Sequence, residues 1–227
     1  MAGNPDAIAI LGGTGDQGLG LALRFARAGR PVVIGSRKLE RAEQAAAEVV
    51  AKVPGADVVG LENAEATKRA PLVILSLPFE HTAATLKGLS EAFEPGQIVV
   101  SMAVPLATAV GDGAARTIGV WQGSAAELVA SLVPEGVRVV SAFQNVAAHR
   151  LMDLDHPVEC DVLVSGAPKD REPVMALCAL VPGLRALNGG PLGNARIVES
   201  LTALMIGLNV RYKLPEGCGV RFTGLGD

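Results

Sequence analysis

The stretch AIAILGGTGDQGLGLALRFARAG, residues 7–29, decides the fold of this chain. Its first part, residues 7–11, is apolar and short, as in a strand buried on both faces of an α/β sheet. Five glycines then follow within nine residues. From Leu19 onward the apolar residues recur at i, i+3, i+4 and i+7, which predicts a helix that ends near Gly29. The expected local order is therefore strand, glycine turn and helix.

Three of these glycines, Gly13, Gly15 and Gly18, fit the pattern G-x-G-x-x-G. The first glycine of that pattern allows a tight turn, the second lets a diphosphate approach bare backbone, and the third lets helix and strand pack closely. The helix N-terminus adds unpaired N–H groups and a partial positive charge. The turn therefore predicts a dinucleotide-binding site. Asp16 fits this site poorly, because its carboxylate repels a diphosphate unless it points away or caps the helix.

The composition limits the classes of partner. A net charge of −3 provides no basic field, so nucleic acid is excluded as a main partner. The longest apolar run, residues 201–210, is about half the length that a membrane span needs, so we expect no membrane segment. The N-terminus lacks the pattern of a secretory signal, and the three cysteines are far apart in the sequence. We therefore expect reduced thiols and a cytoplasmic location.

Short apolar runs alternate with helical stretches along the chain, which indicates an α/β protein with a Rossmann-like, doubly wound parallel sheet. Further strands are expected over residues 31–35, 57–61, 72–77, 97–102, 137–143, 161–165 and 217–222. Further helices are expected over residues 39–53, 64–69, 81–93, 124–132, 169–180 and 193–212. We place a boundary near residue 155, between a nucleotide-binding domain of residues 1–155 and a small C-terminal α/β domain of residues 156–227.

The end of the second expected strand indicates which dinucleotide binds. In this fold an Asp or Glu at that point binds the adenosine 2′-hydroxyl and favours NAD. The chain instead reads GSRKLER, which places Ser36, Arg37 and Arg41 there. A 2′-phosphate is nearly dianionic and guanidinium forks bind it with two hydrogen bonds, so NADP is the expected cofactor. The alternative is that both arginines lie on a solvated helix face.

Several segments together resemble one family, the NADPH-dependent reductases of coenzyme F420. They are, in chain order, ILGGTGDQGLGLALRFARAG, VVIGSRKLERA, LSLPFEH, SMAVP, SAFQNVAAHRL and GPLGNARIVESLTALMIGLN. The resemblance covers nearly all of the chain. It implies hydride exchange between NADP and a reduced deazaflavin, coenzyme F420, in a homodimer whose small C-terminal domain helps to cover the nicotinamide.

The same resemblance implies residues of the site. The diphosphate would lie at Thr14, Gly15, Asp16 and Gln17, and the 2′-phosphate at Ser36, Arg37 and Arg41. The path toward the nicotinamide would be lined by Leu77, His81, Val104 and Ala148. His81 also follows Pro78 at the end of a strand, where ligands bind in open α/β sheets. A helix-capping or solvated histidine is the alternative at that position.

One departure from the family concerns the second substrate. The family often has an imidazole where this chain has Gln144, and a glutamine forms hydrogen bonds but carries no charge. Gln144 and Asn145 therefore hold the deazaflavin edge, serve a different electron acceptor, or satisfy backbone groups in a turn.

The residue types in this sequence fit a reaction in which the protein acts by positioning two bound cofactors. Hydride transfer between two stacked rings needs reacting atoms about 3–3.5 Å apart and no nucleophile. The sequence has no G-x-S-x-G or H-E-x-x-H motif and its three histidines lack ligand-like spacing, so we predict no catalytic nucleophile and no metal site. Two alternatives stay open. One is an NADPH-dependent reductase of another acceptor, such as a flavin, a metal chelate or a small carbonyl compound, and the other is a non-catalytic NADP-binding sensor.

Overall fold

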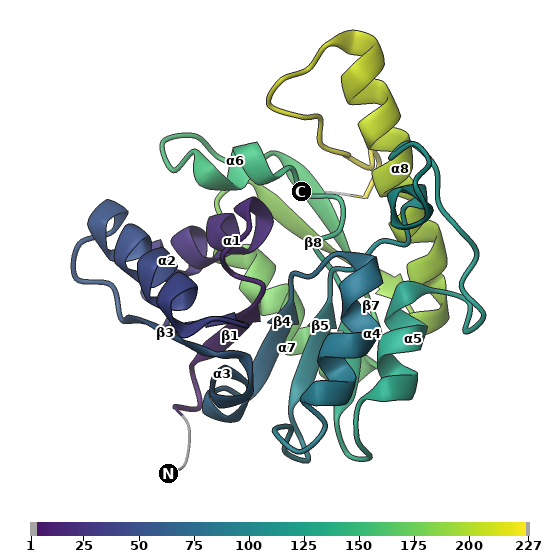
Figure 1. Cartoon of the computed structure of the whole chain (residues 1–227). Helices are drawn as coiled ribbons and strands as arrows, with labels where there is room; N and C mark the ends of the chain where they lie inside the picture. Colours follow the sequence, from purple (N-terminus) through teal and green to yellow (C-terminus); the bar gives the residue numbers. More distant parts are fainter. Residues whose placement is uncertain (1–3, 226–227) are drawn as a thin grey trace.

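The computed structural model describes residues 4–225 and contains an eight-stranded sheet with helices on both faces (Figure 1). The strands are β1 (Ile8–Leu11), β2 (Val32–Ser36), β3 (Val58–Glu62), β4 (Leu72–Leu75), β5 (Ile98–Ser101), β6 (Arg138–Ser141), β7 (Cys160–Ser165) and β8 (Leu184–Gly190). The α-helices are α1 (Asp16–Arg27), α2 (Leu39–Lys52), α3 (Asn63–Arg69), α4 (Phe79–Gly88), α5 (Ala125–Leu132), α6 (Ala148–Met152), α7 (Pro168–Ala179) and α8 (Ala195–Tyr212). Two short 3₁₀ helices are η1 (Ala107–Val110) and η2 (Leu192–Asn194).

The strand order is β3-β2-β1-β4-β5-β6-β7-β8. The first six strands of this order are parallel, which gives the 3-2-1-4-5-6 arrangement of a Rossmann sheet and confirms the predicted fold class. The order reverses between β1 and β4, and ligands of such sheets bind in the crevice at the carboxyl ends of those strands. β7 then pairs antiparallel with β6 through Ser141 and Ser165, and β8 pairs parallel with β7.

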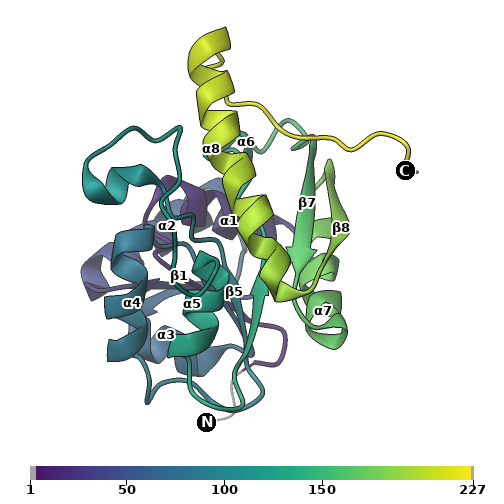
Figure 2. The ribbon, with the colours of Figure 1, turned by 90° about the vertical axis from the view of Figure 1, so that its right-hand side faces the viewer.

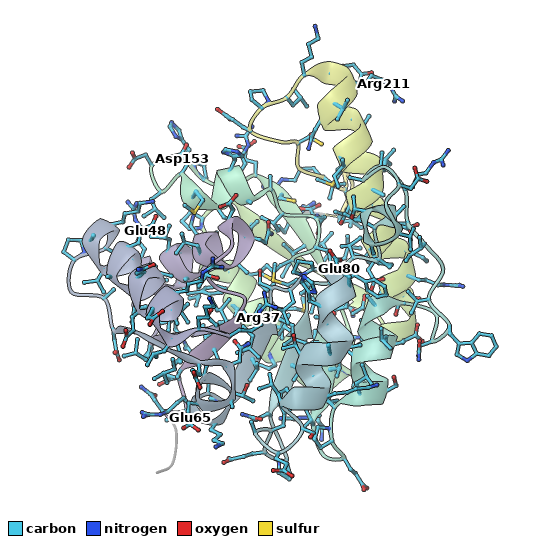
Figure 3. The ribbon with its side chains drawn as sticks, in the orientation of Figure 1. Arg37, Glu48, Glu65, Glu80, Asp153 and Arg211 are labelled. Atoms are coloured by element: carbon cyan, nitrogen blue, oxygen red, sulfur yellow. The ribbon has the colours of Figure 1, made fainter. Side chains whose placement is uncertain are left out.

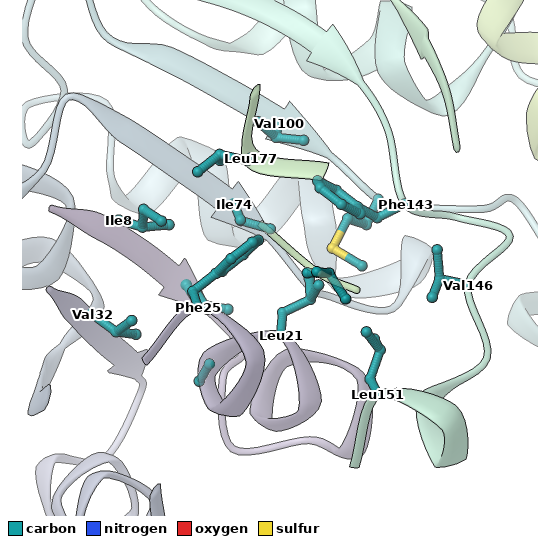
Figure 4. Packing of buried hydrophobic residues seen from close by; sticks show 14 of the residues in the cluster. Ile8, Leu21, Phe25, Val32, Ile74, Val100, Phe143, Val146, Leu151 and Leu177 are labelled. Atoms are coloured by element: carbon teal, nitrogen blue, oxygen red, sulfur yellow. The ribbon is translucent and has the colours of Figure 1, made fainter. Parts of the chain in front are cut away.

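The hydrophobic core fills both faces of the sheet. One cluster joins the strands to α1, α2, α6 and α7, and a second cluster joins them to α3, α4 and α5. Every residue of β1 is fully buried, because it is a central strand covered on both sides. In the first cluster the rings of Phe25 and Phe143 meet edge to face with centroids 6.3 Å apart (Figure 4). This contact joins α1 to the segment after β6.

The structure confirms the strand, turn and helix order of the first segment. α1 begins at Asp16, three residues earlier than the apolar pattern predicts, because that pattern does not register the polar first turn. It ends at Arg27, and Gly29 adopts a left-handed φ of +78°, as the predicted helix end requires.

The predicted closing strand at residues 217–222 is wrong. A backbone hydrogen bond, from the Asp161 N–H to the Val220 carbonyl at 2.7 Å, and several side-chain bonds hold this segment in place of a sheet ladder. The buried Asp161 carboxylate accepts hydrogen bonds from Arg185 at 2.9 and 2.8 Å, from Arg221 at 2.8 Å and from the backbone N–H of Phe222 at 2.7 Å. The Arg185 hydrogen bonds, together with those from Phe222 and Arg221, hold the pKa of Asp161 well below its usual range. The last strand is instead β8, whose sequence LRALNGG has none of the β-branched residues that indicate strands.

Helix α8 runs along one side of the molecule and projects beyond the rest (Figure 2). Within residues 4–225, no helix combines the length and the apolar character that a membrane span requires. All three cysteines are free thiols, and Cys160 and Cys178 are buried. In the same described range, no group of three or more His, Cys, Asp or Glu side chains is placed to hold a metal ion.

Candidate dinucleotide site

The glycine turn after β1 has a backbone path that only small residues allow. Gly12 has a φ of +80°, and an added Cβ there would lie 2.3 Å from the carbonyl oxygen of Ser76. An added Cβ at Gly18 would lie 2.8 Å from the carbonyl oxygen of Gly12. At Gly15 the nearest atom to an added Cβ is 3.7 Å away, so this position is open. The turn is therefore closed on its strand side and offers bare backbone on its outer side.

Helix α1 begins at this turn without a side-chain cap. Gly15 is its N-cap residue, so the N–H groups of the first turn have no side-chain acceptor there. Asp16 is exposed in the first turn, where a carboxylate interacts favourably with the helix dipole and does not cap the helix. The side chain of Gln17 donates to the carbonyl of Val146 at 2.8 Å, in the loop after β6. Its side-chain amide is therefore bound within the protein and is not free to contact a ligand through that N–H.

Two adjoining cavities meet at the glycine turn. One has a volume of about 640 Å³ and extends to the end of β2, and the other has a volume of about 290 Å³ and extends to the loop after β6. The residues that line both cavities are Gly15, Ser76, Leu77 and Pro78. The pair forms a path from the first turn of α2, across the glycine turn, to Gln144.

Positive charge gathers at the far end of the larger cavity. Ser36 is the buried last residue of β2, and its hydroxyl accepts the N–H of Lys38 at 3.3 Å. Arg37, Lys38 and Arg41 also line this cavity, and Arg37 lies near the middle of the molecule (Figure 3). Within the part of the chain that the structure describes, neither guanidinium forms an ion pair with the protein. Three cations without an internal anion give this end of the cavity a positive charge that suits a phosphate.

Gln144 forms the wall at the other end of the path. The preceding residue, Phe143, adopts a left-handed φ of +67°, which turns the chain after β6. The buried side chain of Gln144 donates to the hydroxyl of Ser141, and its backbone carbonyl accepts the hydroxyl of Thr202 from α8 at 3.0 Å. Among the described residues, Oε1 of Gln144 has no hydrogen-bond partner. A buried acceptor that lacks a donor fits a ligand that supplies one.

The structure brings eleven of the sixteen predicted residues to the two cavities, and five line neither of them: Gly13, Gly18, Val104, Asn145 and Ala148. Asn145 turns away, because its amide donates to the carbonyl of Asp161 at 2.7 Å and to the thiol of Cys160 at 3.2 Å. Asn145 therefore satisfies a backbone carbonyl, which is one of the alternatives that the sequence left open for it. His81 is exposed on the first turn of α4 and lines the larger cavity.

Six lining residues were not identified from the sequence: Gly12, Lys38, Asn63, Ser76, Thr85 and Met102. Lys38, Asn63 and Ser76 each come within two residues of the end of a strand, namely β2, β3 and β4. Since the carboxyl ends of parallel strands share one edge, this position was a usable signal. Thr85 lies in the second turn of α4, where the sequence gives no comparable signal.

Helix α8 is fixed against this site by a buried carboxylate. Glu199 accepts hydrogen bonds from the backbone N–H groups of Ala125 and Ala126, at 2.9 and 3.1 Å, and so caps α5 from another helix. Burial raises the pKa of Glu199, and the two backbone hydrogen bonds oppose that shift. α8 therefore has a defined position, with Thr202 one turn further on against Gln144.

The fold, the glycine turn and the cationic end of the cavity define a dinucleotide-binding protein of the Rossmann class. A family model described as "NADP oxidoreductase coenzyme F420-dependent" matches residues 7–105. The chain is 50% identical over 223 residues to the F420-dependent NADP reductase of Methanocaldococcus jannaschii. That alignment covers 96% of this chain and 98% of the relative. It is 42% identical over 222 residues to the F420-dependent NADP reductase of Methanothermobacter marburgensis, and this alignment covers 96% of this chain and 98% of that relative. The chain therefore belongs to the family of F420-dependent NADP reductases.

A solved structure has the same fold. It is the crystal structure of a protein from Arthrobacter sp. FB24, provisionally named as an F420-dependent NADP-reductase. The TM-score is 0.78 at 21% sequence identity, and the match covers 96% of this chain and all of that chain. At this identity the likeness concerns the fold alone.

Proposed function

We propose that this chain transfers a hydride reversibly between NADP(H) and coenzyme F420. The observation that carries the proposal is the path of two adjoining cavities, with Arg37 and Arg41 at one end and Gln144 at the other. One end suits a phosphate on the adenosine ribose, and the other ends at a buried polar side chain. The F420-dependent relatives support the choice of the second substrate.

The residues of the glycine turn and the first turn of α1 would hold the diphosphate by backbone contact. They are Gly13, Thr14, Gly15, Asp16, Gln17 and Gly18. The open position at Gly15 supports this assignment, because a side chain there would fill the approach to the turn. Ser36, Arg37 and Arg41 would hold the 2′-phosphate, since a hydroxyl and two guanidinium groups face one cavity.

The nicotinamide half would occupy the smaller cavity, near Leu77 and Pro78. His81, Val104 and Ala148 stay proposals as residues along this path. Bound NADPH supplies the hydride, and no residue of the chain has to form a covalent bond. Leu77 and Met102 offer apolar walls that exclude water from the reacting atoms.

Gln144 would face the deazaflavin and accept a hydrogen bond at Oε1. Its buried, unpaired acceptor and its place in the cavity wall support this role, whereas Asn145 lines neither cavity and its amide N–H donates to β7. We also propose that residues 156–227 act as the small domain that covers the site, and residues 1–155 as the nucleotide-binding domain. The hydrogen bond from Thr202 to the Gln144 carbonyl supports this division of roles.

We further propose a cytoplasmic homodimer. Large apolar side chains are exposed along α8, including Ile197, Leu204 and Val210, and Trp121 in the loop before α5 is 98% exposed. Burial of such surface against a second copy would stabilise a dimer. The three free thiols agree with a reducing compartment. Light scattering of the purified protein at several concentrations tests the assembly.

The test of function is a spectroscopic assay with purified protein. NADP added to reduced coenzyme F420 should give growth of the oxidised deazaflavin absorbance together with formation of NADPH. If NADPH is oxidised only when a flavin, a metal chelate or a carbonyl compound is added, the second substrate is wrong. If NADP binds but no acceptor supports turnover, the chain is a sensor. The departure at Gln144 makes these controls necessary.

A further inference from the structure

Asn63 is a buried polar residue that the proposed mechanism does not yet use. It is the first residue of α3 and directly follows β3. Its side chain lines the larger cavity of about 640 Å³ and also a neighbouring cavity of about 380 Å³. The neighbouring cavity shares Ser36 and Arg37 with the larger one and continues past them toward α4. Asn63 therefore lies just beyond the proposed 2′-phosphate site.

The side-chain oxygen of Asn63, Oδ1, lacks a hydrogen-bond partner among the described residues. The residue is only 8% exposed. Its backbone carbonyl accepts the hydroxyl of Thr67 at 2.8 Å, which fixes the backbone at this residue. A Cβ at Gly35 would lie 3.0 Å from Oδ1, and the glycine thus leaves room for the amide. A buried acceptor without a partner in the chain needs a donor from outside it, such as water or a ligand, and Asn63 lines two cavities that could admit one.

The position of Asn63 indicates which part of a dinucleotide it would contact. The adenine base and the 2′-phosphate are attached to the same ribose, so the base lies beside the groups that bind that phosphate. From Ser36 and Arg37 the available space continues into the smaller neighbouring cavity, where Ala64, Thr85 and Asn63 form part of the wall. An asparagine amide matches the edge of adenine, since it accepts from the 6-amino group and donates to the adjacent ring nitrogen.

We propose that Asn63 recognises the adenine base of NADP, with the 6-amino group donating to Oδ1. This inference rests on the proposed function and adds a base-selective contact to it. It assigns to Asn63 the selection of adenine over a base with a 6-oxo group, because a carbonyl at that place would face the acceptor and leave it unpaired.

Calorimetric titration with two nucleotides tests the assignment. The probes are NADP and its hypoxanthine analogue, in which a 6-oxo group replaces the 6-amino group. The wild-type protein should bind NADP about tenfold more tightly than the analogue. Asn63→Ala should bind both with equal affinity, whereas Asn63→Asp keeps the acceptor and should keep the preference for NADP.

Arg41→Ala is the matched control, because it should weaken both nucleotides equally and leave their ratio unchanged. A variant that merely loses stability also changes both affinities together. A tenfold preference that survives in Asn63→Ala overturns the inference, as does a wild-type protein that does not distinguish the two nucleotides. If the wild-type protein binds neither of them, the proposed function itself is wrong. If Asn63→Ala does not fold, Asn63→Leu removes the same hydrogen bonds and gives the same test.

Discussion

Replacing Arg37 with alanine tests whether the site prefers NADP to NAD. Arg37 is exposed, and in the described part of the chain its guanidinium has no internal partner. The substitution therefore removes no native contact, and the free energy of unfolding should change by less than about 0.5 kcal/mol. One charge-assisted hydrogen bond contributes about 1.5–3 kcal/mol, so NADP should bind roughly ten- to a hundredfold more weakly. NAD lacks the phosphate and should bind as before.

The assay is calorimetric titration of both nucleotides, followed by steady-state kinetics with coenzyme F420. Arg211→Ala is the control, because Arg211 is an exposed arginine near the end of α8, away from Arg37 (Figure 3). The KM for NADP should rise in Arg37→Ala with little change in kcat, since the phosphate is remote from the reacting carbon. An equal loss of affinity for NAD and NADP, or a fall in kcat alone, would refute the assignment.

Three further changes probe the turn, the second pocket and the C-terminal segment. Gly12→Ala should lower the free energy of unfolding, measured by urea titration, by about 3 kcal/mol, because the added Cβ would clash with the backbone. The control is Gly29→Ala, where φ is similar but the space is open, and the free energy of unfolding should fall by only about 1 kcal/mol. Equal losses in the two variants would contradict the clash. Gln144→Ala should raise the KM for coenzyme F420 about tenfold and leave the calorimetric Kd for NADP unchanged, and the reverse pattern would move Gln144 to the cofactor site. The hydrogen bonds from Arg185 lower the pKa of Asp161 below 3.8, so the stabilisation is complete above that pH and is lost as the pH falls through the lowered pKa. Asp161→Asn should therefore cost about 3 kcal/mol at pH 7, and this difference should shrink in acid; a difference that grows in acid would count against the pairing.

The nucleotide-binding half of the fold could be predicted because local patterns determine it. The strand at residues 8–11 is fully buried, and α1 has one apolar face, so period and composition locate both elements. The last strand could not be found in this way, since β8 contains LNGG and depends on pairing with β7 for its conformation. Residues 217–222 show the opposite case. Their sequence resembles a strand, but Asp161 fixes them by side-chain bonds that no local pattern indicates.

The predictable part of the candidate site follows the same division. Gly15, Arg37 and Arg41 belong to contiguous motifs, and the structure brings all three to one cavity. Gln144 also lines a cavity as expected, but its neighbour Asn145 points to β7. Adjacent residues after a strand point in different directions, so sequence alone could not separate the two.

The loop after β6 shows how the protein can control the proposed reaction by positioning. Gln17, in the first turn of α1, donates to the Val146 carbonyl, and Thr202 of α8 donates to the Gln144 carbonyl. The first turn of α1 and helix α8 thus both hold the same short loop. Since hydride transfer depends on ring positions to within a fraction of an ångström, fixing this loop to both elements sets the two proposed ring sites relative to each other. Positioning of this kind is the contribution that the protein has to make, because the cofactors carry the reacting atoms.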